Sequence, residues 1–114
     1  MKKILIANRG EIAIRIARTC NDLGIKTVGI FSEDDINSLH LSEMDKSFMI
    51  DEKGASAYLN IKKIIAIAKQ EKVDGIHPGY GFLSENPAFA KAAKQARLKF
   101  IGPSEKSLTI FGDK

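Results

Sequence analysis

The stretch that decides the fold is "ILIANRGEIAIRIARTCNDLG", residues 4–24. Residues 4–7 form a continuous apolar run, which is typical of a strand covered on both faces in a parallel sheet. After "NRG", one side of the following segment is apolar at helical spacing, and these residues are Ile12, Ala13, Ile16, Ala17, Cys20 and Leu23. Gly24 ends the helix, because a residue without Cβ tolerates the left-handed conformation. The stretch therefore predicts a strand that leads directly into a helix.

The same alternation continues along the chain. Further strands are predicted at 27–31, 48–50, 73–76 and 100–101, with a short helix around 38–44 and a loop, "DEKGAS", at 51–56. Asn60 and the pair Asn86-Pro87 predict the starts of two longer helices, and Pro103 opens a last short one. Strands that alternate with helices through short loops predict right-handed βαβ units. We predict an α/β fold, a Rossmann-like doubly wound parallel sheet of about five strands.

The composition places the chain among ordinary globular domains. Its 114 residues are enough for one domain, and 44% hydrophobic with 28% charged residues disfavours disorder. No apolar run approaches the ~18 residues of a membrane span, and the N-terminal run meets charge at Arg9, too early for a signal peptide. The single cysteine, Cys20, excludes an internal disulfide and fits a reducing compartment. We expect a cytoplasmic protein with no membrane association.

The net charge of +4 does not by itself indicate nucleic-acid binding. The lysines are scattered along predicted helix faces and are not interleaved with aromatic residues that could stack on bases. A solvated face, or a surface that meets an acidic partner or a phosphate, fits this pattern better. We therefore expect no nucleic-acid partner.

The turn "ANRGEIA", residues 7–13, stands where a dinucleotide-binding fold has its first turn. The dinucleotide fingerprint needs three glycines at fixed spacing, and this turn has one, so NAD binding is disfavoured. One interpretation is a tight turn from strand to helix in which Arg9 and Glu11 are solvated or paired, and a functional role for these two side chains stays equally open.

The outer face of the first predicted helix carries charge. Glu11 and Arg15 stand at i,i+4, as do Arg18 and Asp22, so each couple can form an ion pair. Ile14 lies beside the arginines, and arginine is enriched in protein interfaces. The face is therefore either a protein–protein contact or a solvated surface with one stray isoleucine.

The segment "HPGYGFLSEN", residues 77–86, is the richest in chemistry-bearing residues. Gly79 and Gly81 flank Tyr80, and glycine allows a ligand or another chain segment to approach the backbone closely. The amides ahead of the helix capped by Asn86 favour an anion.

A structural interpretation of the same segment stays open. His77 has no partner at metal-ligand spacing, so it predicts a strand-end histidine and no metal site. Tyr80 and Phe82 could cover the sheet edge, and Glu85 could interact with a helix dipole. From the residues alone, the segment is either scaffold or ligand-facing.

Five motifs together resemble one known family. "ILIANRGEIAIRIARTC", "AYLN", "IHPGYGFLSEN", "FIGPS" and the terminal "GDK" are similar, in this order, to the N-terminal domain of biotin carboxylase. This component is shared by acetyl-CoA, propionyl-CoA and pyruvate carboxylases. The resemblance covers nearly the whole chain, and the segment 34–57 matches less well.

The resemblance implies a ligase activity. Members of the family use ATP and Mg²⁺ to activate bicarbonate as carboxyphosphate, and then carboxylate N1 of a biotin tethered to a carrier protein. It also implies that residues 1–114 are the domain that precedes an ATP-grasp fold, with the α/β core at about 1–103 and a helix and linker at 104–114. We expect the remaining carboxylase domains, a biotin carboxyl carrier protein or domain, and a homodimer as partners.

The resemblance also assigns roles to residues. Tyr80 and Gly81 match loop residues that border the biotin pocket, and Glu85 and Asn86 complete that loop. Lys114 matches a lysine that contacts ATP. The family's dimer interface is matched by Arg15, Arg18 and Asp22. It assigns no catalytic and no metal-binding residue to this chain, so we expect the 114 residues to be inactive alone, with no tightly bound cofactor.

Two other functions stay open at this point. The chain could be a non-catalytic module that dimerises or interacts through the face of Arg15 and Arg18. It could also be the N-terminal domain of another ATP-grasp ligase, against which the form of "HPGYGFLSEN" argues.

Overall fold

The computed structural model describes residues 2–79 and 86–101. The predictions that fall on 80–85 and on 102–114, including the last short helix at Pro103, lie outside these ranges. No helix of the described part is long and apolar enough to cross a membrane.

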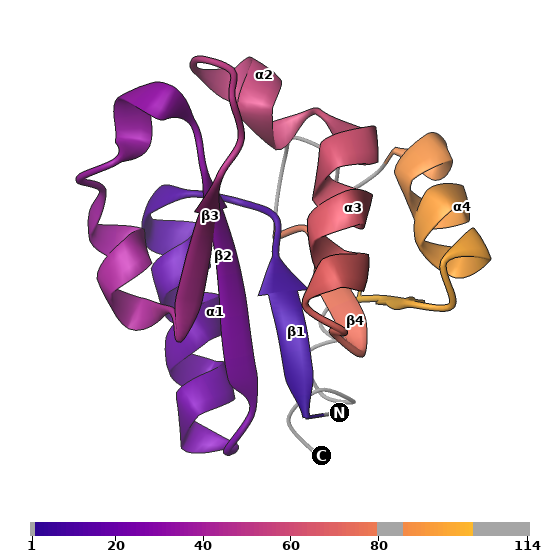
Figure 1. The fold of residues 1–114 in the computed structure, drawn as a ribbon. Helices are drawn as coiled ribbons and strands as arrows, with labels where there is room; N and C mark the ends of the chain where they lie inside the picture. The colour runs from indigo at the N-terminus through magenta and orange to yellow at the C-terminus, as the bar shows by residue number, and fades with distance from the viewer. Residues whose placement is uncertain (1, 80–85, 102–114) are drawn as a thin grey trace.

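The five strands form one parallel sheet in the order β3-β2-β1-β4-β5 (Figure 1). Its strands are β1 Lys3–Ile6, β2 Lys26–Phe31, β3 Lys46–Met49, β4 Gly75–His77 and β5 Lys99–Phe100. At the centre, β1 pairs with β2 and β4, so that Ile6 lies opposite both Gly29 and His77. The predicted parallel sheet of about five strands is confirmed.

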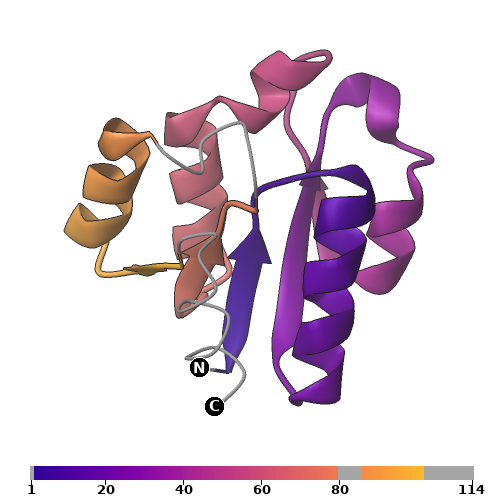
Figure 2. The same cartoon turned by 180° about the vertical axis from the view of Figure 1, so that it is seen from behind.

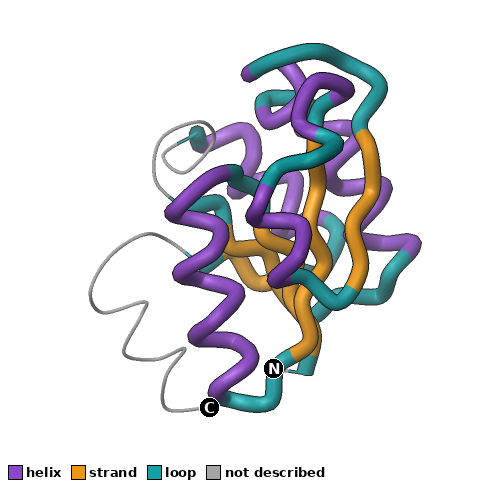
Figure 3. Tube along the Cα trace, turned by 90° about the vertical axis from the view of Figure 1, so that its left-hand side faces the viewer, coloured by secondary structure: helices purple, strands orange, loops and turns teal. Residues whose placement is uncertain are grey.

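Helices cover both faces of this sheet (Figures 1 and 2). The α-helices are α1 Gly10–Asp22, α2 Ala55–Tyr58, α3 Ile61–Gln70 and α4 Pro87–Gln95, and two 3-10 helices, η1 Glu33–Asp35 and η2 Leu39–Glu43, lie between β2 and β3. Seen along the sheet in Figure 3, the strands lie between layers of helix. This arrangement confirms the predicted doubly wound fold.

The alternation of β1 side chains divides the core in two. Ile4 and Ile6 belong to the cluster that α1 covers through Ile16, whereas Leu5 belongs to the cluster that contains Ile64 of α3. Since successive side chains of a strand point to opposite faces, a strand that is apolar at every position needs cover on both. The run "ILIA" has that cover, with residues 4–7 fully buried.

The order of the strands defines a switch point between β1 and β4. The chain leaves β1 toward α1 on one face and leaves β4 toward α4 on the other (Figures 1 and 2). In doubly wound sheets, ligands bind in the crevice beyond the carboxyl ends of the strands at this point. The segments that follow β1 and β4 are therefore the first place to look for a site.

Both predicted helix caps are confirmed. The Asn60 side chain accepts a hydrogen bond from the Lys63 amide, and Asn86 accepts from Ala88 and Phe89 at 2.8 and 3.2 Å. Each asparagine satisfies amides that the first helical turn leaves without a partner.

Three local predictions were wrong or incomplete. The segment "DEKGAS", predicted as a loop, contains the start of α2, which forms because Ala57 and Tyr58 bury against the core. The helix expected around residues 38–44 is the 3-10 turn η2. Neither predicted ion pair on α1 forms among the described residues; Arg18 pairs with Glu43 of η2 at 3.0 Å in place of Asp22.

Candidate functional site

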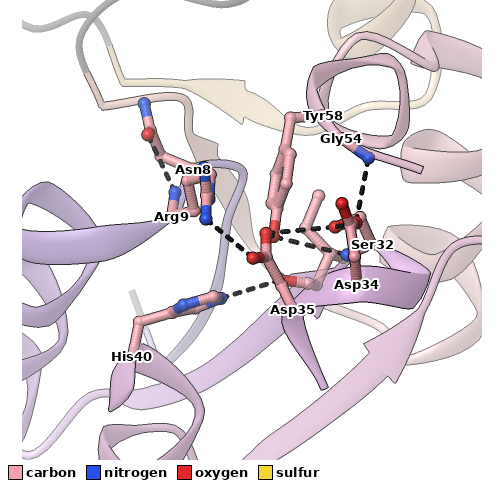
Figure 4. Close-up of polar contacts among 9 residues, drawn as sticks. Asn8, Arg9, Ser32, Asp34, Asp35, His40, Gly54 and Tyr58 are labelled. Atoms are coloured by element: carbon pink, nitrogen blue, oxygen red, sulfur yellow. Dashed lines mark hydrogen bonds and ion pairs between the residues drawn. The ribbon is translucent and has the colours of Figure 1, made fainter. Parts of the chain in front are cut away.

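Polar side chains gather where β1, β2 and β4 end. Figure 4 shows those that follow β1 and β2, together with His40 and Tyr58. Asn8, Ser32, Asp35, His40 and His77 are at most 8% exposed, although each carries groups that need hydrogen bonds. Burial of so many polar side chains at one edge is costly unless their partners are in place. The contacts between them therefore define the candidate site.

Asn8 joins the segment after β1 to the segment after β4. Its Nδ2 donates to the carbonyl of Pro78 at 2.8 Å, and its Oδ1 accepts from the Arg9 amide at 2.8 Å. The side chain is 1% exposed. It thus links the two segments that border the switch point.

The segment after β4 is also held by its own residues. The Gly79 amide donates to His77 Nδ1 at 3.0 Å, which requires that nitrogen to be unprotonated. Burial lowers the pKa of His77 to about 4, so the ring is neutral at physiological pH. His77 is a structural acceptor at the end of β4, as the sequence predicts.

A second cluster centres on Asp35. Its carboxylate accepts from Arg9 Nη2 at 2.7 Å and from the Tyr58 hydroxyl at 2.8 Å, and Ser32 Oγ lies 3.0 Å away. Burial acts to raise the pKa of Asp35, but the hydrogen bonds from Tyr58 and Ser32 and the charge of Arg9 outweigh it and lower the pKa. Asp35 is therefore a charged, fully engaged group.

Arg9 extends from Asp35 to solvent. Its side chain is 48% exposed, and its guanidinium lies 6.0 Å from the centre of the Tyr58 ring as well as on Asp35. A guanidinium presents five N–H donors in a fixed plane, and Asp35 uses only part of them. Arg9 is thus held in one orientation while it can still meet an anion or a carbonyl.

Ser32 and Asp34 connect the ends of β2 and β3. The Ser32 hydroxyl lies 2.6 Å from Asp34 Oδ1, to which the Gly54 amide also donates at 2.9 Å. The hydrogen bond from Ser32, followed by that from the Gly54 amide, lowers the pKa of Asp34. One hydroxyl proton cannot serve Asp34 and Asp35 at once, so Ser32 links them alternately.

His40 supports the cluster from η2. Its Nε2 lies 3.1 Å from the Ile30 carbonyl and therefore carries the proton. Burial lowers the pKa of His40, so the ring is neutral. Neither buried histidine is available as a cation at neutral pH.

The described residues supply hydrogen-bonding groups at this edge. They contain no cluster of three or more His, Cys, Asp or Glu side chains that could hold a metal ion. Burial raises the pKa of Cys20 to about 12, which leaves its thiol protonated and unreactive. The polar groups at the edge are amides, carbonyls, an imidazole, a carboxylate and a guanidinium, which are joined by hydrogen bonds.

The predicted site residues fall into two groups. Tyr80, Gly81, Glu85 and Lys114 lie outside the described residues, while Asn86 is in place as the cap of α4. The predicted interface residues Arg15, Arg18 and Asp22 are exposed on the outer face of α1. The structure brings no described biotin-loop residue into contact with this interface face.

Sequence reasoning missed Asn8 and the Asp35–Tyr58 contact. Asn8 could have been found, because it directly follows an apolar strand at the edge where ligands gather. Tyr58 could not, because 23 residues separate it from Asp35 and no local pattern relates them.

The fold and the site define the class of protein. A doubly wound parallel sheet with buried polar side chains at its switch point is an α/β domain of the class in which ligands bind beyond the carboxyl ends of the strands. The chain belongs to the biotin carboxylase N-terminal domain family: the family model "Biotin carboxylase, N-terminal domain" matches residues 1–108.

Relatives agree with this assignment. The chain is 53% identical to a pyruvate carboxylase of Staphylococcus aureus, over 100% of this chain and 10% of that protein. It is also 53% identical to a biotin carboxylase of Halalkalibacterium halodurans, over 99% of this chain and 25% of that protein. The chain thus spans about a tenth to a quarter of the length of these relatives.

Solved structures share the fold. The biotin carboxylase domain of a single-chain bacterial carboxylase superimposes with a TM-score of 0.87 at 44% identity, over 100% of this chain and 27% of that one. The biotin carboxylase domain of Hydrogenobacter thermophilus 2-oxoglutarate carboxylase gives 0.86 at 42% identity, over 97% and 24%. That domain was solved as a dimer with MgADP, ADP and bicarbonate.

Proposed function

We propose that this chain is the N-terminal part of a biotin carboxylase, a ligase that works in the cytoplasm. The full enzyme uses ATP and Mg²⁺ to convert bicarbonate to carboxyphosphate, and transfers its carboxyl group to N1 of biotin on a carrier protein or domain. The observation that carries the proposal is the family match across residues 1–108.

The carboxyl edge of the sheet is suited to biotin. The ureido ring of biotin is neutral, so it is recognised by shape and hydrogen bonds. The buried groups of the edge hold the segment after β4 in place, through Asn8 on the Pro78 carbonyl and His77 on the Gly79 amide. Tyr80, Gly81, Glu85 and Asn86 belong to the segment proposed to border biotin, and Pro78 and Gly79 begin it. A rigid wall also helps to exclude water from carboxyphosphate, which hydrolyses readily.

ATP and Mg²⁺ are proposed to bind mainly through other domains. The described residues contain no metal-ligand cluster, and Lys114 is the one residue of this chain assigned to ATP. We accordingly propose that residues 1–103 form the α/β core and that 104–114 lead toward an ATP-grasp domain. The 114 residues alone are then inactive.

A chimaera tests the proposal. This chain would replace the matched quarter of the 53% identical biotin carboxylase, and the incorporation of labelled bicarbonate into free biotin would be measured. We expect activity from the chimaera and none from the 114-residue chain or from the relative without its N-terminal quarter. An inactive but folded chimaera contradicts the function, and ATP-dependent turnover by the isolated chain contradicts the division of labour.

We also propose that the full enzyme is a homodimer that uses Arg15, Arg18 and Asp22. The Arg18–Glu43 pair is exposed, with 66% and 26% of the two side chains accessible, so breaking it costs at most ~1 kcal/mol of fold stability. Sedimentation of the chimaera should show a dimer that Arg18→Glu weakens and Lys62→Glu, on α3, leaves intact. A chimaera that is monomeric, or equally dimeric with both substitutions, contradicts this interface.

A further inference from the structure

The hydrogen bonding between β1 and β4 continues past the end of both strands. The Ala7 amide donates to the His77 carbonyl at 2.9 Å, and one residue further along each segment Asn8 Nδ2 donates to the Pro78 carbonyl at 2.8 Å. A side-chain amide therefore extends the contact beyond the last backbone hydrogen bond of the pair. It does so at the switch point of the sheet, where the two segments separate toward opposite faces.

The Asn8 side chain has a defined orientation. Its Oδ1 accepts from the Arg9 amide at 2.8 Å, which directs Nδ2 to the Pro78 carbonyl. Pro78 is buried, so water does not readily replace a lost donor there. The contact thus fixes Pro78 relative to β1.

Gly79 packs closely against the Asn8 side chain. A Cβ at Gly79 would stand 2.6 Å from Asn8 Nδ2 and 2.9 Å from Ile12 Cγ2, and φ at this residue is +68°. Both the space and the backbone conformation therefore require glycine. With its amide on His77 Nδ1, Gly79 is fixed on two sides.

We propose that Asn8 is a positioning residue for biotin. By holding Pro78 and Gly79 it sets the direction in which the chain leaves β4, and so determines the affinity of the full enzyme for biotin without touching the reacting atoms. This inference rests on the proposed function. It assigns the turn "ANRGEIA" a role in biotin binding that acts through the neighbouring strand.

The principal test is Asn8→Asp in the chimaera. The introduced carboxyl keeps the shape of asparagine and the acceptor for Arg9, but its second oxygen faces the Pro78 carbonyl in place of a donor. We expect the KM for free biotin to rise about tenfold, while the KM for ATP stays within about twofold of the unsubstituted chimaera.

The pH dependence separates positioning from general damage. A buried carboxyl has a raised pKa, and its protonated form can donate to the Pro78 carbonyl as asparagine does. The ratio of the variant's biotin KM to the unsubstituted value should therefore shrink from about pH 8 to about pH 6. Over this range His77 stays neutral, so its titration does not account for the change.

Gly79→Ala disturbs the contact between Asn8 and Pro78 from the β4 side. Asn60→Ala is the control for a loss of stability away from this contact. Gly79→Ala should raise the biotin KM, and its combination with Asn8→Asp should raise it by less than the product of the single effects. Asn60→Ala removes a cap on α3 and should lower the melting temperature with the biotin KM unchanged.

The contact itself can be read in the 114-residue chain by NMR. The Asn8 side-chain amide protons should exchange slowly with solvent, and Gly79→Ala should abolish that protection. Fast exchange in the unsubstituted chain overturns the inference. A folded Asn8→Asp chimaera with an unchanged biotin KM also overturns it, and so does one in which the KM values for biotin and ATP rise equally. If the unsubstituted chimaera carboxylates nothing, the proposed function fails, whereas slow exchange of the Asn8 amide still supports the contact.

Discussion

The two edges of the sheet are built differently. At the carboxyl edge, Asn8, Asp35 and His77 are buried and contact other side chains or a neighbouring segment. At the amino edge, Asp45 and Asp74 are exposed and accept backbone amides, such as Thr27 to Asp45 at 2.7 Å.

The two edges differ in whether water can replace a lost hydrogen-bond partner. An exposed acceptor regains a hydrogen bond from solvent when its partner is removed, so its position is loosely constrained. A buried acceptor does not, so the carboxyl edge holds its groups in a fixed geometry. In this domain the buried polar contacts, which need fixed partners, lie at the edge where a ligand would bind. The polar contacts of the opposite edge are exposed to water.

The largest expected effect is that of Asp35→Ala. The substitution leaves the Tyr58 hydroxyl buried without its acceptor and removes the partner of Arg9, so unfolding should become easier by about 3 kcal/mol. Urea unfolding of the 114-residue chain measures this. Asp34→Ala, at the exposed neighbour, should cost clearly less, and equal losses would mean that burial does not distinguish the two carboxylates.

The second effect is a pH dependence due to His77. Its pKa is about 4 in the folded chain and about 6.5 when unfolded, so the unfolded chain binds more protons between these values. The contribution of His77 to stability is therefore complete above about pH 6.5 and falls with acidification, by about 2 kcal/mol at about pH 5.

His77→Asn isolates that contribution. The asparagine oxygen can accept from the Gly79 amide as Nδ1 does, but it does not titrate. Stability measured by urea at several pH values should fall less steeply in the variant between about pH 6.5 and about pH 4. Curves that run parallel for the two proteins would contradict a neutral, buried His77.

The third effect concerns the end of the segment that starts at Gly79. Asn86→Ala removes the acceptor for the Ala88 and Phe89 amides and should cost about 1 kcal/mol. Asn86→Ser keeps a capping oxygen and should recover most of the loss in the same unfolding assay. A serine variant as unstable as the alanine variant would mean that capping is not the role of Asn86.

The smallest effect belongs to the amino edge. Asp74 Oδ2 accepts the Lys2 and Lys3 amides at 2.7 and 2.9 Å, and these hydrogen bonds lower its pKa. Asp74→Asn keeps an acceptor and loses only an exposed charge, so the cost should be below about 1 kcal/mol and should shrink in salt. A loss as large as that of Asp35→Ala would remove the distinction between the edges.

Much of the fold was predictable because its signals are local. The apolar run at 4–7, the helical period after it and the caps Asn60 and Asn86 each depend on neighbours in sequence. The helix α2 was not predictable from local sequence, because it depends on distant contacts. In α2 the Tyr58 ring is buried in the core and its hydroxyl donates to Asp35.

The location of the candidate site could be predicted from the sequence, but the contacts within it could not. Polar residues after apolar strands mark the carboxyl edge, and the resemblance assigned the loop after β4 to biotin. The contacts of Asn8 with Pro78 and of Arg9 with Asp35 join residues 70 and 26 positions apart. Such pairs depend on the strand order β1-β4 and β1-β2, which no single motif states.

Hydrogen exchange of the chimaera with and without biotin tests the central claim most directly. If the carboxyl edge borders biotin, amides around Asn8 and Gly79 should gain protection when biotin is added, and amides around Thr27 and Lys46 at the amino edge should not change. Protection at the amino edge alone, or equal protection of the two edges, would contradict the assignment of the site to the carboxyl edge.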